Sequence, residues 1–446
     1  MEERYRSAIE AASACLSEAL LGDKETLLDH GFRLDALVRD LLRVVGLAVL
    51  KALYGALCQH LVHQARRQGL EIQSRLVVRF KTLFGELEVE SPYLWSRTSR
   101  ESARPLKDRL GIEGEQYSVS VQRALVDFGS ENSFARAAKR FKEHYGFEVG
   151  RTTLRNLTLE AAKEAEPYID LRLCEGTKAY HQSLFERPGV PELLVELDGC
   201  EIRTGIMMSA AEAGVSDRQG QERVRQENWR EVRTGLVGPV ESKERLYVCR
   251  LDSYGEVCEQ LFGVACLEGL TSRTQVVAPG DGAGGLREAL LVPFAKAQYI
   301  LDHPHLKSHF YETAEALGMA DSKREGWVSG HMKQLWKGKV KGVLKKLRRC
   351  HEEAPHERLR RLIEFVERFQ DCVHYGDYKA RGWPIGSGEV ESAHRYVPQE
   401  RLKISGACWH PDNVNPMLSL RVIRANDWWD EFWQWRLCQR QEQSRV

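Results

Sequence analysis

The sequence predicts an α/β domain with a mixed sheet, which a helical segment interrupts and a mainly helical N-terminal region precedes. Short apolar runs at residues 193–199 and 275–282 each end in Asp-Gly and have the length of strands. Residues 305–374 have helical periodicity with no break into strands, and apolar residues recur at helical spacing through the first 69 residues. Strands that run into helices are typical of an α/β sheet.

The composition is that of an ordinary soluble globular protein. The chain has 446 residues, of which 42% are hydrophobic and 29% charged, and this excludes disordered and collagen-like proteins. At roughly 100 to 200 residues per domain, two to four domains are expected. The net charge of +1 does not decide for or against nucleic acid, because a binding site uses local charge. The eleven cysteines include no Cys-x-x-Cys pair, so we expect reduced thiols and no zinc ribbon.

No membrane association is expected. The most apolar stretch, residues 44–61, contains Lys51, Gln59 and His60, and so lacks the ~20 uninterrupted apolar residues of a membrane span. It therefore predicts a buried helix. The first 25 residues include Glu2, Glu3, Glu10 and Glu18 and no apolar segment followed by a cleavage site, so we expect a cytoplasmic protein.

The N-terminal part divides into three predicted regions. Residues 1–75 are helical, and residues 76–115 hold a β-hairpin around Gly85 and Glu86 followed by a basic loop. Residues 116–185 predict three helices. Five basic side chains of the loop could contact phosphate without a metal, namely Arg97, Arg100, Arg104, Lys107 and Arg109.

The second and third helices of the 116–185 region have the layout of a helix-turn-helix. A short amphipathic helix at 133–141 is followed by a turn at 145–149 and by a second helix capped by Thr152 or Thr153. This layout predicts DNA contact through basic residues, and an ordinary helical hairpin is the alternative that spacing leaves open. The residues expected to contact DNA are Arg136, Lys139, Arg151 and Arg155.

Six strands are predicted after residue 190, in a core formed by residues 190–304 and 382–446. They lie at 193–199, 201–207, 232–237, 246–251, 275–282 and 298–302. A helical insertion at 305–381 contains residues 333–349, which hold eight Lys or Arg and no acid. Such a run is either a solvated face or a surface for phosphates, with Lys337, Lys341, Lys345 and Lys346 as the expected DNA contacts. The tryptophans of the last 38 residues predict a packed helical tail.

Three carboxylates could converge in this core. Asp198 and Asp281 each end a predicted strand and precede a glycine, and Glu391 or Glu389 begins a helix after the rigid turn at 382–388. Carboxylate oxygens suit Mg²⁺ or Mn²⁺, and three carboxylates can hold two ions for phosphoryl transfer. Taken alone, a strand-ending Asp-Gly is more often a turn than a ligand.

Together these motifs resemble the DDE transposases of bacterial insertion sequences, which have an RNase H-like catalytic core interrupted by an all-helical insertion. The matching motifs are Val195-Glu196-Leu197-Asp198-Gly199, Trp229-Arg230-Glu231-Val232, Gly280-Asp281-Gly282-Ala283, Tyr299-Ile300-Leu301-Asp302 and residues 383–391. The resemblance implies that Asp198, Asp281 and Glu391 are the catalytic residues and metal ligands. In the family the third acid follows Gly-Ser-Gly by three positions, which selects Glu391 over Glu389. The Asp302-x-x-His305 element implies a supporting role, compatible with a helix cap by Asp302.

The resemblance implies a transposase that binds the ends of its element and a target DNA. The resemblance further implies two bound ions, Mg²⁺ or Mn²⁺, with which the protein would cleave a strand and transfer it, as a homo-oligomer associated with the nucleoid. A DNA-binding regulator or domesticated transposase without catalysis, and an RNase H-like nuclease without strand transfer, are the alternatives. Relatives often carry a Cys-rich zinc ribbon after the hairpin, whereas this chain has no Cys between Cys58 and Cys174. A zinc site formed by His303, His305 and His309 is not expected either.

Overall fold

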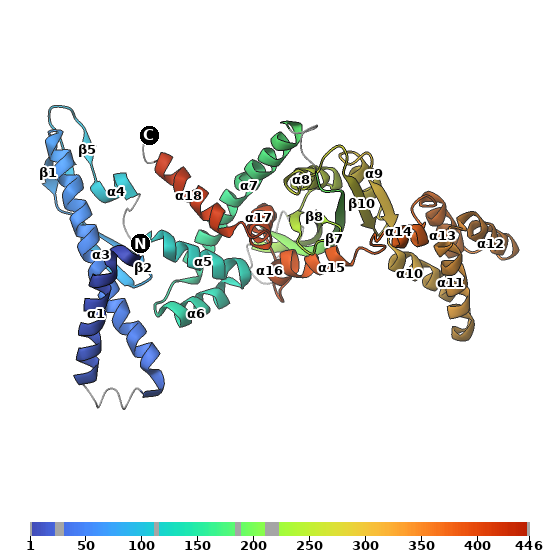
Figure 1. Ribbon diagram of the computed structural model, residues 1–446, viewed down its shortest axis with the longest axis horizontal. Coiled ribbons are helices and arrows are strands. Elements are labelled where there is room, and N and C mark those ends of the chain that lie inside the picture. The colour runs from blue at the N-terminus through green and yellow to red at the C-terminus, as the bar shows by residue number, and fades with distance from the viewer. Residues whose placement is uncertain (1, 23–30, 111–115, 183–188, 210–222, 444–446) are drawn as a thin grey trace. The chain divides into compact units, whose positions relative to one another are not determined.

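The computed structural model describes residues 2–22, 31–110, 116–182, 189–209 and 223–443 (Figure 1). The chain divides into two compact units. Unit 1 comprises Met1–Leu125, Lys139–Val149 and Leu437–Val446, and unit 2 comprises Val126–Ala138 and Gly150–Arg436.

Unit 1 combines a long helix with two small sheets. The predicted hairpin is confirmed, because β2 and β3 pair antiparallel from Val77↔Glu90 to Thr82↔Gly85. The helix α3 covers this hairpin, and Tyr54 and Cys58 of α3 pack with Phe80 and Leu87. The strand orders are β1-β4-β5 and β3-β2-β6. The elements are α1 (Glu2–Gly22), α3 (Leu34–Arg67), β1 (Glu71–Ser74), β2 (Val77–Thr82), β3 (Gly85–Glu90), β4 (Tyr93–Trp95), β5 (Ser102–Ala103), α4 (Pro105–Leu110) and β6 (Gln116–Tyr117).

The prediction that residues 44–61 form a buried helix is wrong. The helix exists, but Cys58 and Ala65 are its buried residues. The hairpin covers one side of α3, so a stripe of apolar side chains on the helix remains exposed, including Val38, Leu42, Val45, Val49 and Leu53. Among the described helices, Gly31–Arg67 is long and apolar enough to cross a membrane by length and composition. Core helices and signal sequences meet the same criterion, so this is weak evidence.

The three helices predicted between residues 117 and 164 are confirmed as α5 (Val119–Glu131), α6 (Phe134–Tyr145) and α7 (Arg151–Gln182). Gly146 has φ +77 in the turn after α6, a conformation that glycine adopts without strain. The predicted cap by Thr152 or Thr153 is wrong, because α7 begins at Arg151 and both threonines lie within its first turn.

The core of unit 2 is a mixed sheet, as predicted, but it has five strands and not six. The strand order is β11-β10-β7-β8-β9. The strands β7, β8 and β9 pair antiparallel, whereas β10 and β11 run parallel to β7. The strands are β7 (Glu192–Ser209), β8 (Arg223–Pro239), β9 (Leu246–Arg250), β10 (Gln275–Gly280) and β11 (Gln298–Leu301). The helices α8 (Tyr254–Leu267) and α9 (Leu286–Leu291) belong to the same unit.

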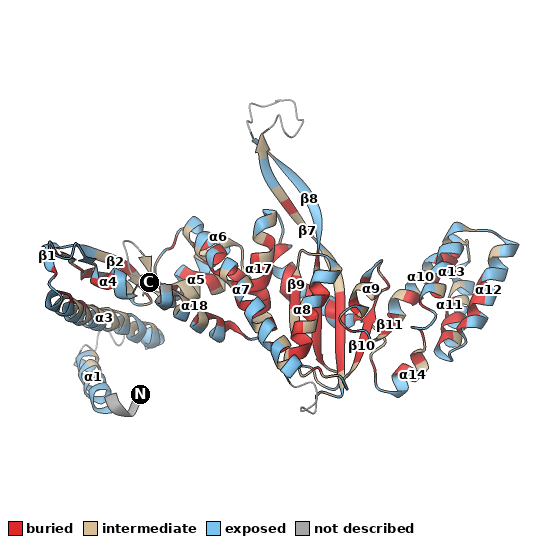
Figure 2. Ribbon diagram, turned by 90° about the horizontal axis from the view of Figure 1, so that it is seen from above, coloured by how far each residue is buried: buried red, intermediate tan, exposed pale blue. Residues whose placement is uncertain are grey.

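The predicted break between strands 193–199 and 201–207 is wrong, because β7 is continuous through both. Asp198 therefore lies inside a strand and does not end one. Pairing with β8 holds this part of β7 extended, with Asp198 opposite Thr234 and Gly199 opposite Arg233. The outer part of the β7–β8 hairpin continues beyond the rest of the sheet as a largely exposed ribbon (Figure 2).

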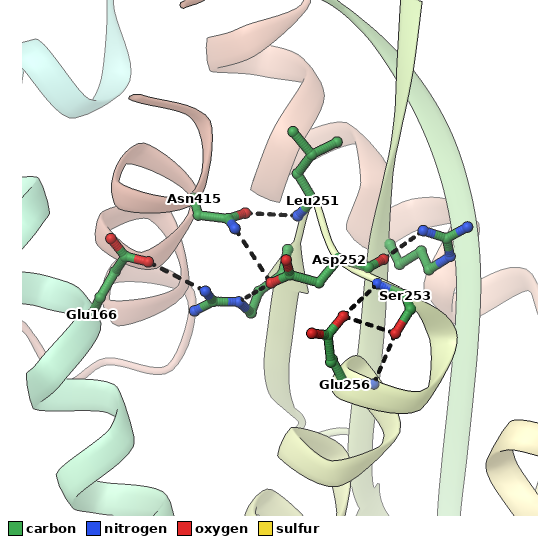
Figure 3. A network of polar contacts seen from close by, with 8 residues as sticks. Glu166, Leu251, Asp252, Ser253, Glu256 and Asn415 are labelled. Carbon is green, nitrogen blue, oxygen red and sulfur yellow. Dashed lines mark hydrogen bonds and ion pairs between the residues drawn. The ribbon is translucent and has the colours of Figure 1, made fainter. Parts of the chain in front are cut away.

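A polar network joins α7 to the sheet and to helix α17 (Val414–Ala425) (Figure 3). Arg250 at the end of β9 forms ion pairs with Glu166 of α7 and with Asp252. Asn415 accepts a hydrogen bond from the Leu251 N–H and donates one to Asp252. The adjacent helix α8 begins with a capping box between Ser253 and Glu256. These contacts hold α7 beside the five-stranded sheet of unit 2.

The helical insertion is confirmed. It leads from β11 through α10 to α14 and returns to the sheet at α15. The predicted packed tail is also confirmed, because Trp428, Trp429 and Trp433 are buried. The helices are α10 (His303–Ala316), α11 (Asp321–Trp336), α12 (Val340–Glu353), α13 (Glu357–Arg368), α14 (Tyr375–Ala380), α15 (Gly388–His394), α16 (Glu400–Leu402), α17 and α18 (Trp429–Gln443).

Candidate active site

Strand register aligns three aspartates at one end of the sheet. The parallel pairing of β10 with β7 runs from Gln275↔Glu192 to Val277↔Leu194, and the same offset carried four residues beyond the last pair would set Asp281 opposite Asp198. On the other side of β10, Gly280 pairs with Leu301, so the residues that follow this pair, Asp281 and Asp302, lie opposite each other. Neighbouring strands lie about 4.8 Å apart. Asp198, Asp281 and Asp302 therefore occupy one row across three adjacent strands.

Glu391 reaches this row from helix α15. Val390 and Ala393 of that helix pack against Leu194 of β7 in one buried cluster. The Val390 N–H donates a 2.8 Å hydrogen bond to the buried Glu196 carboxylate, which fixes the first turn of α15 on β7. At the end of α15, Nε2 of His394 lies 3.1 Å from the Asp198 carbonyl oxygen, within hydrogen-bonding distance.

The carboxylates act on one another electrostatically. Burial raises the pKa of Asp198, while the Gly199 N–H and His394 lower it. The negative charges of Asp281 and Glu391 raise it further, which indicates that all three groups lie within one electrostatic neighbourhood. Burial also raises the pKa of Glu196 to about 8. A cation bound here would relieve this repulsion between carboxylates.

The donor chemistry fits Mg²⁺ or Mn²⁺, but the side chains do not form a ready coordination sphere. Within the described residues, no three His, Cys, Asp or Glu side chains make a metal-binding group. Local hydrogen bonds account for part of this. Oδ1 of Asp198 accepts from the Gly199 N–H at 2.7 Å, and Oδ1 of Asp281 accepts from the Ala283 N–H at 2.8 Å. Hard oxygen ligands remain the kind that these ions take.

Glu389 and Glu391 have different surroundings. Both oxygens of Glu389 bind the Arg245 guanidinium, at 2.7 Å and 3.1 Å. Oε1 of Glu391 instead lies 3.6 Å from Nε2 of His305, and the negative charge of Glu391 raises the pKa of Asp198. The arginine neutralises Glu389, so Glu391 is the one whose charge remains available to a cation.

Asp302 links the sheet to the turn that precedes α15. Its carboxylate caps α10 by accepting from the His305 N–H at 2.7 Å. It also accepts from the N–H and the hydroxyl of Ser387, at 2.7 Å and 2.9 Å. The helix cap considered from the sequence is confirmed, and these contacts place His305 and Glu391 next to each other. His303, by contrast, packs edge-on against the rings of Trp336 and Tyr375.

The basic residues predicted to contact DNA are all exposed. Arg136 and Lys139 lie on α6, and Arg151 and Arg155 lie in the first two turns of α7. The segment after the hairpin, predicted as a basic loop, instead contains β5 and α4, and its five basic residues are exposed as well.

The run from Lys333 to Arg349, which we call the lysine segment, spans the end of α11 and most of α12. Within the described residues, its six lysines, including Lys337, Lys341, Lys345 and Lys346, have no carboxylate partner. Its two arginines are ion-paired, Arg348 with Glu367 and Arg349 with Glu353. The opposite side of α12 buries Val340, Val343, Leu344 and Leu347.

Sequence reasoning missed two residues of the site, His394 and Glu196. His394 follows Glu391 by three positions, which places both on one side of a helix. Glu196 precedes Asp198 by two positions on one strand, so both side chains leave the same face of the sheet. Spacing could have indicated both residues once the strand and the helix had been predicted.

The comparisons with known proteins are limited. The uncharacterised protein family UPF0236 matches residues 27–185, upstream of the acidic site. No curated protein matches the chain. Among solved structures, the chain is similar to the Drosophila P element transposase strand transfer complex at 11% sequence identity and a TM-score of 0.26, covering 74% of this chain and 82% of that one. At that score the similarity does not define a fold, so any function must be argued from the residues of this chain.

Proposed function

We propose that this protein is a DNA transposase of an insertion sequence, with an RNase H-like core that cleaves and transfers DNA strands. The observation that carries the proposal is the row of Asp198 and Asp281 on adjacent strands with Glu391 beside it on α15. The helical insertion between Asp281 and Glu391, joined to a mixed sheet, supports it further.

In this proposal Asp198, Asp281 and Glu391 hold Mg²⁺ or Mn²⁺, most simply as two ions. The bound metal would activate the attacking oxygen and stabilise the leaving oxygen of the scissile phosphate. The protein holds the ligands in position: Glu196 anchors the first turn of α15, and Asp302 ties the turn before it to β11 and α10. His305 and His394 lie at the edge of the carboxylates, where they can donate hydrogen bonds.

Element ends and target DNA are the proposed partners. Phosphates would bind to the lysine segment, whose lysines lack carboxylate partners among the described residues, and to the exposed arginines at the start of α7. A homo-oligomer is proposed because two element ends must be held together for transfer.

A DNA-binding protein without catalysis is the second candidate. It is favoured by one observation, namely that no three potential ligands among the described residues form a metal-binding group. The basic surfaces would then bind DNA, while the acidic row would be a structural remnant.

The test incubates the purified protein with the DNA that flanks its reading frame, a target plasmid and Mg²⁺ or Mn²⁺, beside Asp281→Asn. Metal-dependent nicks and joined products that require Asp281 support the transposase. Nicks without joined products favour a nuclease without strand transfer. Binding of the flanking DNA without any nick in either protein favours the second candidate, provided that the DNA includes both true ends.

A further inference from the structure

A pocket of about 590 Å³ lies in unit 2, at the start of α7 and apart from the acidic row. Its wall is basic: Arg151 and Arg155 of α7, Arg225 of β8 and Arg401 of α16 all line it. None of the described residues that line it is an acid. A cavity of this size is typical of a small-ligand site.

Among the described residues, the buried guanidinium of Arg401 has no carboxylate paired with it. The Arg401 residue is 2% exposed, and its Nε donates a 2.9 Å hydrogen bond to the Gly129 carbonyl. Its Nη2 has no hydrogen-bond partner among the described residues. Burial lowers the pKa of Arg401 to about 10, so the group is still charged at neutral pH. Glu131, the acid that acts on it, is ion-paired with Arg421.

Aromatic rings hold this cation in place. The Arg401 guanidinium lies 4.6 Å from the Phe134 ring centroid and 4.7 Å from that of Trp409, and both rings also line the pocket. Cation–π contact offsets part of the cost of burying the charge but supplies no hydrogen-bond acceptor. An anion in the pocket would supply one.

The start of α7 adds a second attraction for an anion. This helix is 32 residues long, and its first turn carries Arg151 and Thr152 into the pocket lining. The N–H groups of a first helical turn have no partners within the helix, and the helix dipole favours negative charge there. The helix terminus and the buried Nη2 of Arg401, which has no hydrogen-bond partner among the described residues, are independent observations that indicate the same kind of ligand.

We propose that this pocket, the Arg401 pocket, binds the phosphate group of a nucleotide. Arginine forks match phosphate oxygens, and the pocket volume leaves room for the sugar and base against Phe134 and Trp409. The nucleotide belongs either to a DNA strand or to a free nucleotide, since the recognising chemistry is the same. This inference deepens the DNA-binding part of the proposed function and does not depend on catalysis at the acidic row.

The test uses the full chain carrying Asp281→Asn, so that DNA is bound but not cut. The probes are a fluorescent single-stranded oligonucleotide and dAMP, each titrated at a fixed salt concentration. Arg401→Met and the double variant Arg151→Gln/Arg155→Gln should each weaken binding about tenfold or more. Arg230→Gln changes an exposed arginine of β8 outside the pocket lining and is the matched control, expected to change affinity less than about twofold.

Alkylation of Cys408 gives a readout that needs no change in the pocket. Cys408 lines the pocket, whereas Cys174 is exposed on α7 and does not line it. A bound nucleotide should slow iodoacetamide modification of Cys408 but not of Cys174, as measured by peptide mass spectrometry. This readout decides the question if Arg401→Met fails to fold.

Protection by dAMP identifies a free nucleotide, and protection by the oligonucleotide alone identifies a DNA strand. Either result supports the Arg401 pocket. Binding of neither probe, or binding that leaves Cys408 unprotected and is indifferent to Arg401→Met, overturns it. The metal-dependent nicking assay with Asp281 intact remains a separate test, so failure of the acidic site and failure of the pocket are distinguishable.

Discussion

The acidic row and the lysine segment are assembled in opposite ways. The row joins Asp198, Asp281 and Asp302 through strand register, and one packed helix brings Glu391 beside it. The lysine segment is a single stretch, Lys333–Arg349, whose basic side chains are exposed at the end of α11, in the turn that follows and on α12. The first depends on long-range contacts, whereas the second depends on local composition.

This difference teaches how each region should respond to substitution. A site made by convergence needs each group at one position, so a single change removes a whole function. A surface that attracts phosphates through net charge distributes its effect over many residues, so each contributes a modest and nearly equal share. The predictions below test whether the two regions differ in this way.

The largest effect is expected from Glu391→Gln. Loss of one carboxylate ligand removes transition-state stabilisation worth several kcal/mol, which corresponds to a fall in metal-dependent nicking of roughly 10²- to 10⁴-fold. The measurement is the initial rate of nicking on flanking DNA at saturating Mn²⁺.

Glu389→Gln is the matched control, two residues away on the same helix. Glu389 pairs with Arg245, whose side chain is 4% exposed, so this change should lower the melting temperature while nicking persists. If the two variants lose nicking equally, the assignment of the third acid to Glu391 is wrong.

Asp302→Ala should have the next largest effect, this time on stability. The residue is 2% exposed and accepts three hydrogen bonds, one from His305 and two from Ser387. Losing the cap costs about 1 kcal/mol, and leaving the buried Ser387 N–H unpaired costs a further 1 to 3 kcal/mol. Urea denaturation should therefore show that the free energy of unfolding falls by about 2 to 4 kcal/mol.

Ser308→Ala on the exposed side of α10 is the control and should change the free energy of unfolding little. A loss below about 1 kcal/mol would contradict the positioning role of Asp302.

Local sequence patterns were enough for the elements but not for their pairing. The apolar runs predicted the strands, and the helical insertion and packed tryptophans followed from periodicity and composition. The Asp198-Gly199 pair suggested a strand end, yet β8 pairs across it and keeps β7 extended. The local pattern does not contain the pairing between distant strands, so the predicted strand end at Asp198 was wrong.

The same reason explains what was missed in the candidate site. The choice between Glu389 and Glu391 came from a family resemblance, whereas its physical basis is Arg245, 144 residues away from Glu389. Arg401 gave no sign of its role, because its lack of a counter-ion depends on what folds around it. The burial of α3 was wrongly predicted since apolar sequence sets a preference for burial but does not supply the partner.

Neutralising four lysines of the lysine segment should produce a moderate effect on binding. The variant changes Lys337, Lys341, Lys345 and Lys346 to Gln. If each lysine contacts one phosphate, the slope of log affinity against log salt should fall by roughly 3 to 4. Fluorescence anisotropy with duplex DNA between low and moderate salt measures this slope.

The arginines of the same segment are the control. Arg348→Gln and Arg349→Gln remove charges that are already ion-paired. Each should therefore change the salt slope by less than a single lysine variant does. Single lysine variants should each reduce the slope by about one. One lysine that carries the whole effect would contradict the comparison, because it would make this surface a convergent site.

The smallest effect is expected from pH acting on His331 in the core of the insertion. Burial lowers the pKa of His331, and the charge of Lys346 lowers it further. Nδ1 of the neutral ring donates a hydrogen bond to the Trp327 carbonyl, 2.7 Å away, and the ring stacks on Phe310. A histidine whose pKa is depressed on folding gives stability that is present above its unfolded value of about 6.5 and is lost as pH falls through the folded value. Hydrogen exchange in α10 and α11 should therefore report weaker local protection at pH 5 than at pH 7, after correction for the intrinsic exchange rate.

His331→Phe keeps the ring packing and should remove this pH dependence. If protection in the variant still falls with pH as in the unchanged protein, another group controls the stability of the insertion.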